Sequence, residues 1–509
     1  MQDWLTALAD LFVGNFWIWA VIGAWSGFII GSIPGLGPVF ALALAIPLTF
    51  GMEPLSAMIL LGSIYCGTVT GGSVSSVLLN IPGTTGSIAT CWDGFSLAKQ
   101  GRAAEALGAG IMSSTLGTFI GLICLAFLGP LLGRLVAYIG PVEYFSLIIL
   151  AFAFVAAASK GEAIKGFIMG GVGLLFAFVG MDVITAYERF TFGSLFLMDG
   201  VPFGPAVIGI FAFSQLINSA IKGQSISHGE KVTGNVLPGV IAVFKHPITV
   251  VKAWIVGIIA GVMPGLGINI GNIMAYMLEK NASKTQEEKD SFGKGNIRGI
   301  IAPEVANNAT AYANLSSSFA LGIPSGSSDA ILLGGLILWG LTPGKAFFDT
   351  SQSLFFPTLV WGMALAPLIL LPGLFIIKYL AKITEIKPYT LLPLVTVISI
   401  LGSLSSRGHI FDIWVMIVFG FIGYILDRGG FPLSTLVISL VLGTLLETNM
   451  SRALRISDGS WAIFVQKPVS LIVLIISLII VLGAFVDLKT PLVNFFNRFK
   501  FMSKLKIGK

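Results

Sequence analysis

The feature that most constrains the fold of this chain is a long charge-free run that is broken in its middle. Residues 11–52 carry no charged side chain, and Pro34-Gly-Leu-Gly-Pro38 interrupts them. About 20 apolar residues are enough to cross a membrane as a helix, so this run is about twice the length of one span. Proline removes a backbone donor, and glycine adopts conformations that other residues avoid. Unwound backbone at membrane depth is tolerated only inside protein or along a cavity, so the run predicts a broken, protein-covered helix.

Further charge-free windows extend over residues 106–133, 200–221, 350–377 and 468–486. Only 11% of the chain is charged and its mean hydropathy is +0.92, whereas soluble domains carry about 25% charged residues. The windows are apolar throughout, which excludes the alternating pattern of barrel strands. We therefore predict an all-α polytopic integral membrane protein with about 10–13 membrane elements, located in the cell inner (plasma) membrane.

The broken segment occurs twice. Gly31-Ser-Ile-Pro-Gly-Leu-Gly37 recurs at residues 261–267, an offset of 230 (31 to 261). Ser75-Ser-Val-Leu-Leu-Asn-Ile-Pro-Gly83 recurs at residues 317–325, an offset of 242 (75 to 317). The polar segment 279–290 accounts for the difference. Two matches in the same order predict two structural repeats, and each repeat contains two breaks.

The repeats are predicted at about residues 18–130 and 250–375 of a single membrane domain, 1–509. C-terminal spans and a basic tail follow at 430–509. We prefer inverted repeats, because inversion points equivalent breaks at one midplane site. Parallel repeats stay open, because the span count does not fix the parity. The basic tail predicts a cytoplasmic C-terminus, and basic residues confined to loops and tail argue against a nucleic-acid partner.

Broken helices leave N–H groups free at one half-helix start and C=O groups free at the other half-helix end. The free N–H groups favour anions, and the free carbonyls coordinate small cations such as Na⁺. Polar and small side chains gather at both breaks, although any one of them could serve helix packing alone. The predicted substrate and ion site comprises Pro34, Gly35, Gly37, Ser75, Asn80, Pro82, Gly83, Thr84 and Thr85 in the first copy, and Pro264, Gly265, Gly267, Asn269, Ser317, Pro324, Ser325 and Ser327 in the second.

Three acidic residues adjoin the breaks, and an acid inside an apolar segment is costly unless it has a function. Asp93 is expected in a solvated polar loop. Glu304, with Asn307 and Asn308, either caps a helix or binds a cation. Asp329 follows Pro324-Ser-Gly-Ser-Ser328 and has apolar residues after it. It is therefore the acidic residue for which the sequence most favours a binding role.

Catalytic and metal-binding patterns are missing from the sequence. It contains no HExxH, GxSxG or phosphate-binding loop motif. Its three cysteines and three histidines have no metal-ligand spacing. We predict that the protein is not an enzyme and needs no cofactor other than a coupling ion, Na⁺ or H⁺.

Several motifs together resemble the large membrane subunit of tripartite tricarboxylate transporters, the TctA-like family. They are the two Pro-Gly-Leu-Gly segments, Asn80-Ile-Pro-Gly-Thr84 with Asp93-Gly94, and Ala302-Pro-Glu-Val-Ala-Asn-Asn-Ala309 followed by Leu321-Gly-Ile-Pro324. The resemblance covers roughly residues 18 to 440. At Ser325-Gly-Ser-Ser-Asp329 the chain departs from the glycine and small residues expected in the family, so citrate is not assumed as the substrate.

The resemblance implies a secondary active transporter that imports a di- or tricarboxylate and is coupled to Na⁺ or H⁺. It also implies a small membrane subunit and an extracytoplasmic solute-binding protein as partners. Two alternatives remain, an ion or organic-anion channel and a non-transporting membrane scaffold. Channels usually build their pores from rings of equivalent residues, whereas this chain carries a two-fold internal repeat.

Overall fold

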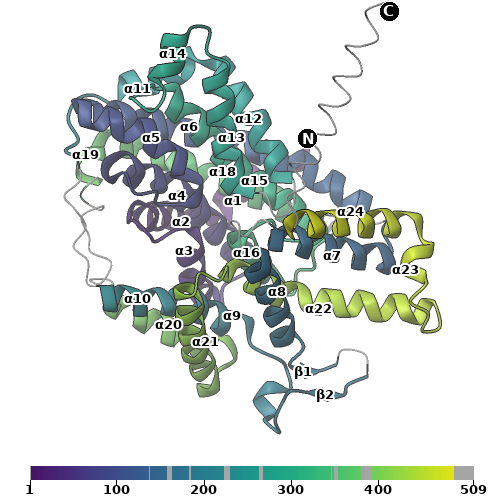
Figure 1. The fold of residues 1–509 in the computed structure, drawn as a ribbon. Helices are drawn as coiled ribbons and strands as arrows, with labels where there is room; N and C mark the ends of the chain where they lie inside the picture. Colours follow the sequence, from purple (N-terminus) through teal and green to yellow (C-terminus); the bar gives the residue numbers. More distant parts are fainter. Residues whose placement is uncertain are drawn as a thin grey trace, which may run out of the picture.

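The structure is a computed structural model, which describes residues 2–136, 138–157, 163–182, 185–222, 230–262, 267–344, 347–348, 354–380, 382 and 392–485. The described part is almost entirely helical. Its only sheet is a small antiparallel hairpin in which β1 (Gly180–Met181) pairs with β2 (Glu188–Arg189). The predicted all-α membrane fold is confirmed (Figure 1). The C-terminal basic tail lies outside the described residues.

The first predicted repeat forms a bent helix followed by a broken one. α1 (Gln2–Val13) precedes it, and it contains α2 (Phe16–Ser32), α3 (Pro38–Ala45), the 3₁₀ turn Ile46–Thr49, α4 (Pro54–Leu79), the 3₁₀ turn Thr85–Ser87, α5 (Ile88–Leu97), the π-helical turn Ala98–Arg102 and α6 (Ala103–Val136). The second predicted repeat contains α12 (Pro247–Val262), α13 (Gly267–Asn281), α14 (Gln286–Ser291), α15 (Arg298–Leu321) and α16 (Ser327–Leu338), and α11 (Leu237–Lys245) precedes it.

The remaining helices belong to neither group. Between the two groups in the sequence are α7 (Pro141–Ala157), α8 (Ala163–Ala177), the hairpin, the 3₁₀ turn Leu195–Leu197, α9 (Phe203–Val207), the π-helical segment Ile208–Phe213 and α10 (Ser214–Lys222). After them come α18 (Phe355–Leu370), the 3₁₀ segment Leu371–Ile376, α19 (Ile377–Leu380), α20 (Leu392–Arg407), α21 (Ile410–Arg428), α22 (Leu433–Ile456), α23 (Ile463–Gln466) and α24 (Pro468–Phe485).

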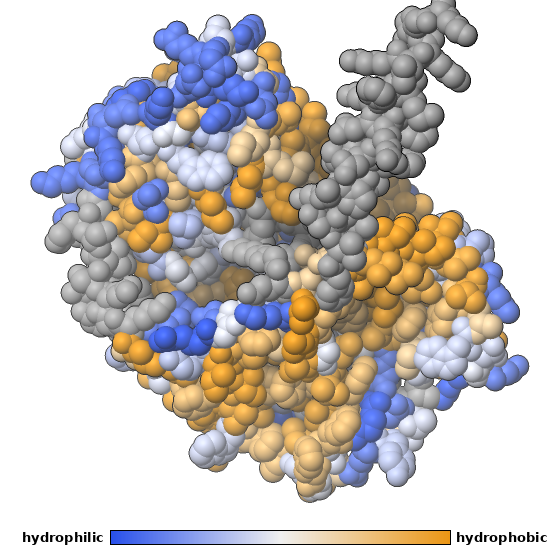
Figure 2. All heavy atoms as spheres, viewed as in Figure 1, coloured by the Kyte–Doolittle hydropathy of each residue, from blue (hydrophilic) through white to orange (hydrophobic). Residues whose placement is uncertain are grey.

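Several helices are long and apolar enough to cross a membrane. The described residues contain five such helices, or seven when two bent pairs each count as one span, and further apolar helices have 10–17 residues. Apolar side chains cover the sides of the molecule, and polar side chains gather over α14 and α11 at one end (Figure 2). This arrangement fits a multi-pass membrane protein. The number of 10–13 membrane elements stays a prediction.

The two predicted repeats share a bend and two close helix contacts. The bend between α1 and α2 is 77°, and the bend between α11 and α12 is 78°. A Cβ atom at Gly31 would lie 2.3 Å from the carbonyl oxygen of Thr68, and one at Gly261 would lie 2.8 Å from that of Thr310. A Cβ atom at Gly27 would likewise meet the carbonyl of Ile64, and its counterpart Gly257 meets that of Ala306. The same offsets of 230 and 242 residues thus relate helix contacts as well as motifs.

The innermost helices are α4 and α15, which pack against α2 and α12 respectively. Every side chain from Leu55 to Leu79 is buried, and so is every side chain from Gly299 to Ala320. Both helices carry many hydroxyl and amide groups in this buried environment, where an unpaired polar group is costly. The predicted polar residues within these two helices (Ser75, Glu304, Asn307, Asn308 and Ser317) therefore lie at the centre of the fold, whereas Asn80 and Thr85 are exposed.

Candidate functional site

The second break of the first copy is set by local backbone chemistry. α4 ends where Asn80 adopts the left-handed conformation (φ 56°, ψ 28°), which asparagine tolerates better than most residues. Pro82 follows, and the chain restarts as a helix after Thr84. The Thr84 and Ser87 side chains form a reciprocal capping box, in which the Thr84 N–H donates to Ser87 Oγ at 3.2 Å.

The two breaks of the first copy lie against each other. A Cβ atom at Gly83 would lie 2.5 Å from both the Gly31 carbonyl oxygen and Ser75 Oγ. A Cβ atom at Gly37 would lie 3.5 Å from the Gly83 carbonyl oxygen, and one at Gly72 would lie 2.7 Å from Thr84 Cγ2. Only glycine allows such an approach. The structure therefore brings the predicted Pro34–Pro38 and Asn80–Thr85 segments together.

The second break of the second copy has the same form. α15 ends at Leu321 because Gly322 adopts the left-handed conformation (φ 64°), and α16 begins at Ser327 after Gly326. Gly322 corresponds to Asn80 and Ser327 to Thr85 under the offset of 242. Ser317 Oγ and Ser325 Oγ lie 3.3 Å apart, so these two predicted residues also meet. Asp329 lies in the first turn of α16.

Each half reaches into the break of the other half. The Asn272 side chain of α13 donates hydrogen bonds to the carbonyl oxygens of Thr85 (3.4 Å) and Gly86. The Tyr65 hydroxyl of α4 donates to Asp329 Oδ1 at 3.3 Å. α3 packs against α16, as α13 packs against the segment that precedes α5. The breaks therefore form one interlocked centre between the halves.

The described part of the chain buries six acidic side chains, and four of them are compensated. Asp412 pairs with Arg407, Glu447 with Arg189, and Glu279 with Arg298 and Lys252; Asp93 accepts three backbone N–H groups. The other two, Glu304 and Asp329, have no cationic partner among the described residues. Uncompensated buried carboxylates are typical of functional sites in membrane proteins.

Glu304 lies inside α15 and caps no helix, so the helix-capping interpretation is wrong. Both of its carboxylate oxygens accept hydrogen bonds, from Thr90 Oγ1 at 2.6 Å and from Ser114 Oγ at 2.8 Å. Asn308 is also paired, because its amide donates to the Glu304 carbonyl at 3.0 Å. Neither polar side-chain atom of Asn307 has a partner among the described residues.

Asp329 differs from Glu304 in one respect. Its Oδ1 accepts the Tyr65 hydrogen bond, but its Oδ2 is buried without a hydrogen-bond partner among the described residues. Asn314, about two turns before the end of α15, lies beside this carboxylate, and its own Oδ1 also lacks a hydrogen-bond partner among the described residues. The Tyr65 and Tyr312 rings pack 6.0 Å apart next to them.

Asp93 is not in a solvated loop, so that expectation is wrong. It lies in α5, is 0% exposed, and its Oδ1 accepts from the N–H groups of Gly293, Gly295 and Asn296 at 2.7–2.9 Å. The Tyr276 hydroxyl donates to its Oδ2 at 2.9 Å. These hydrogen bonds hold residues 293–296, which follow the polar segment 279–290 of the second copy, against α5 of the first copy.

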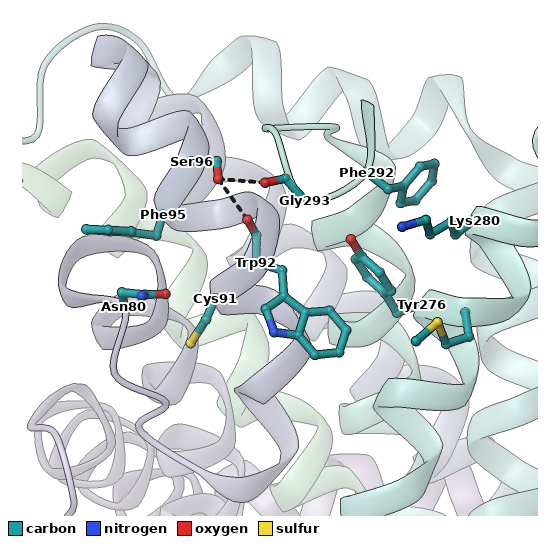
Figure 3. A pocket seen from close by; sticks show the side chains of 10 residues that line it. Asn80, Cys91, Trp92, Phe95, Ser96, Tyr276, Lys280, Phe292 and Gly293 are labelled. Carbon is teal, nitrogen blue, oxygen red and sulfur yellow. Dashed lines mark hydrogen bonds between the residues drawn. The ribbon is translucent and has the colours of Figure 1, made fainter. Parts of the chain in front are cut away.

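A cavity of about 490 Å³ opens beside the Asn80 break (Figure 3). Asn80, Trp92 and Ser96 lie on one side of it, and Tyr276 and Lys280 of α13 lie on the other. The Trp92 and Tyr276 rings meet edge to face at 4.7 Å. Of the predicted site residues, Asn80 alone lines this cavity, so the cavity adjoins the break without containing it.

The rest of the predicted site has a mixed outcome. Pro264 and Gly265 lie outside the described residues, and so does the side chain of Asn269; Gly267 begins α13. Sequence reasoning missed the partners of the two acids, which are Thr90 and Ser114 for Glu304 and Tyr65 and Asn314 for Asp329. Tyr65 and Thr90 lie in stretches with no local signal. The repeat itself offers one clue, because Tyr65 corresponds to Asn307 under the offset of 242.

The sequence is similar to a known family of membrane proteins. A model of the tripartite tricarboxylate transporter TctA family matches residues 17–438. An uncharacterized 52.8 kDa protein in the TAR-I ttuC' 3' region of Agrobacterium vitis is 33% identical over 466 residues, which is 91% of each chain. An uncharacterized protein in the TAR-II ttuC' 3' region of the same organism is 35% identical over 233 residues, which is 45% of this chain and 93% of that protein.

Proposed function

Because this chain belongs to the tripartite tricarboxylate transporter TctA family, we propose that it imports a di- or tricarboxylate by secondary active transport. Uptake is coupled to Na⁺ or H⁺ across the inner membrane. A separate solute-binding protein delivers the substrate, and a small membrane subunit completes the system. The family is that of a transporter component, so no catalysed reaction is assigned.

The observation that carries this proposal is the pair of interlocked breaks in the buried core. At the first, the α5 start and its capping box present backbone N–H groups, and Ser87 is the side chain in the place of Asp329. A helix start favours an anion by roughly 0.3–1 kcal/mol. At the second break the uncompensated carboxylate of Asp329 favours a cation. Substrate carboxylate and coupling cation thus have separate sites, one at each break.

Alternating access follows from the way the halves interlock. Tyr65 contacts the second-copy break, and Asn272 contacts the first-copy break. Movement of one half against the other breaks both contacts and opens the centre to one side. Inverted repeats would make the inward-open and outward-open forms related by the internal symmetry. We propose this arrangement, with repeats at about 18–130 and 250–375.

A second candidate function, a channel, lacks a supporting observation of its own. The glycine contacts between α2 and α4, and between α12 and α15, fill the centre with closely packed helices. Binding sites inside such packing suit a carrier that changes conformation in each cycle. A scaffold would have no use for two uncompensated buried carboxylates.

Uptake into proteoliposomes tests the proposal. The purified chain is reconstituted with its small membrane subunit, and radiolabelled di- and tricarboxylates are supplied with the binding protein under an imposed Na⁺ or proton gradient. We expect uptake that saturates with substrate and requires one of the two gradients. Flux that rises linearly with substrate, without a co-ion, would instead establish a channel. If folded and correctly inserted protein showed no flux with any carboxylate, the result would favour the non-transporting scaffold.

A further inference from the structure

We propose that Asp329, Asn314 and Tyr65 form a binding site for one desolvated monovalent metal cation, for which Na⁺ serves as the probe. The inference rests on the proposed function, because it assigns the coupling cation to a place. It goes further in naming a metal ion over a proton and in placing its ligands on both halves of the protein.

The first argument is the set of open oxygen atoms. Asp329 Oδ2 and Asn314 Oδ1 are buried and have no hydrogen-bond partner among the described residues. Both side chains are 1% exposed, and Tyr65 is 0% exposed. Asn314 lies beside the Asp329 carboxylate. A carboxylate oxygen, a phenol oxygen and the oxygen of a neighbouring side-chain amide are the kinds of ligand that hard cations prefer.

The second argument is the contrast with Glu304. Both oxygens of Glu304 accept a hydroxyl hydrogen bond, at 2.6 Å and 2.8 Å, so neither lacks a partner. Asp329 has one oxygen that accepts from Tyr65 and one without a hydrogen-bond partner among the described residues. The two acids share burial and the lack of a cationic partner, but only Asp329 has an oxygen atom that no hydrogen bond satisfies. Glu304 is therefore the matched control for the site.

The third argument is the position of the ligands in the two halves. Asn314 and Asp329 lie on the two sides of the second-copy break, and Tyr65 lies on α4 of the first copy. A cation held by all three would fix the start of α16 against the end of α15 and against α4. Substrate binding at the neighbouring first-copy break then benefits from an ordered second break. Thermodynamic linkage requires the reverse as well, so substrate must tighten cation binding.

Equilibrium binding of ²²Na⁺ to the full chain in lipid nanodiscs tests the site. We expect saturable binding to the wild type, at least a tenfold weaker affinity in Asp329→Asn, and an affinity within twofold of wild type in Glu304→Gln. The result would overturn the proposal if wild type bound no Na⁺, if Asp329→Asn bound as wild type, or if both variants weakened alike. Proton release on substrate addition that Asp329→Asn abolishes, without saturable ²²Na⁺ binding, would overturn it in favour of a proton.

A charge swap separates ligand loss from misfolding. Asp329→Asn combined with Asn314→Asp moves the carboxylate to the neighbouring ligand and keeps the atom count. We expect the double variant to recover at least part of the ²²Na⁺ affinity that Asp329→Asn loses, with the same elution profile as wild type. Recovery supports the site, and a double variant that folds but binds no better than Asp329→Asn counts against it.

The binding and uptake experiments can reject the cation site and the proposed transport function independently of each other. Site-dependent ²²Na⁺ binding without carboxylate uptake would preserve the site and reject the transporter. Gradient-driven uptake with ²²Na⁺ binding that is insensitive to Asp329→Asn would preserve the transporter and reject the site.

Discussion

The break between α4 and α5 and the break between α15 and α16 have the same backbone form but different charge. Each begins with a left-handed residue, Asn80 or Gly322, and each restarts as a helix at the corresponding position, Thr85 or Ser327. At the third residue of the new helix the first copy has Ser87 and the second has Asp329. The two breaks thus have similar backbones, and under the proposed function the exchange of Ser87 for Asp329 makes one suited to an anion and the other to a cation.

The caps of the two breaks differ as well. Thr84 and Ser87 close the first restart with a capping box, whereas Gly326 offers the second restart no side-chain cap. The first break is held by its capping box, by close glycine contacts and by the Asn272 side chain of the other half. The second is held by the contact between Ser317 and Ser325 and by Tyr65 of the other half, and it has no capping box. We therefore expect the second break to be the more adjustable of the two.

The largest expected effect is on uptake, when the charged residue of the second break and the corresponding neutral residue of the first break are each replaced. Asp329→Asn should lower the initial rate of gradient-driven uptake at least a hundredfold, because losing one charged partner of a buried pair costs roughly 2–5 kcal/mol. Ser87→Ala should mainly raise the substrate concentration at half-maximal uptake, by about tenfold or less, because it removes only neutral hydrogen bonds of the capping box, each worth roughly 0.5–1.5 kcal/mol. Uptake measured against substrate and cation concentration checks both. Equal losses in the two variants would contradict a division of roles.

Steric substitutions test how tightly each break is held. Gly83→Ala should destabilise the folded protein by roughly 1–3 kcal/mol or more, because its Cβ would lie 2.5 Å from a backbone carbonyl oxygen. Gly322→Ala should cost about 1–2 kcal/mol, the usual cost of a left-handed conformation for alanine. Thermal unfolding in detergent measures the order. A more stable Gly83→Ala than Gly322→Ala variant would show that the first break is the looser one.

A matched pair of glycines tests the repeat. Gly31→Ala and Gly261→Ala each place a Cβ against the neighbouring helix, at 2.3 Å from the Thr68 oxygen and 2.6 Å from Ala313 Cβ. We expect similar losses in the two halves, each about 1–3 kcal/mol, read from the same unfolding assay. Adding Gly171→Ala, whose Cβ meets nothing within 4 Å, provides a control that should leave stability near that of wild type. Strongly unequal losses of stability would contradict equivalent helix packing in the two halves.

The smallest effect concerns the caps. Thr84→Val removes the capping-box oxygen and should cost about 1 kcal/mol. Ser325→Ala, near the uncapped restart of α16, should change stability by less than half of that, because its hydroxyl caps no helix. The difference in unfolding midpoint between the two variants measures the contribution of the capping box.

Local rules predicted the breaks better than they predicted the acids. Pro34, Pro82 and Asn80 act on their own turn of backbone, so their effect is visible in the sequence. Asp93 looked like a loop residue because polar residues follow it, yet its partners are backbone N–H groups 200 or more residues away. The pair Gly71-Gly72 also suggests a break in the helix, but α4 continues through it. The missing side chain of Gly72 instead leaves space for the Thr84 side chain. Pairing across the fold decided these cases.

The sequence by itself determined the membrane class, the duplicated unit and the positions where helices must stop, because hydropathy and the chemistry of proline, glycine and asparagine act over a few residues. Only the tertiary structure decided which buried acids are compensated. Tyr65 and Asp329 are 264 residues apart, and Glu304 is 214 residues from Thr90 and 190 residues from Ser114, its two hydroxyl partners. No periodic pattern in the sequence predicts contacts between residues so far apart. They form only when the two broken helices pack together and side chains of one half contact the other half.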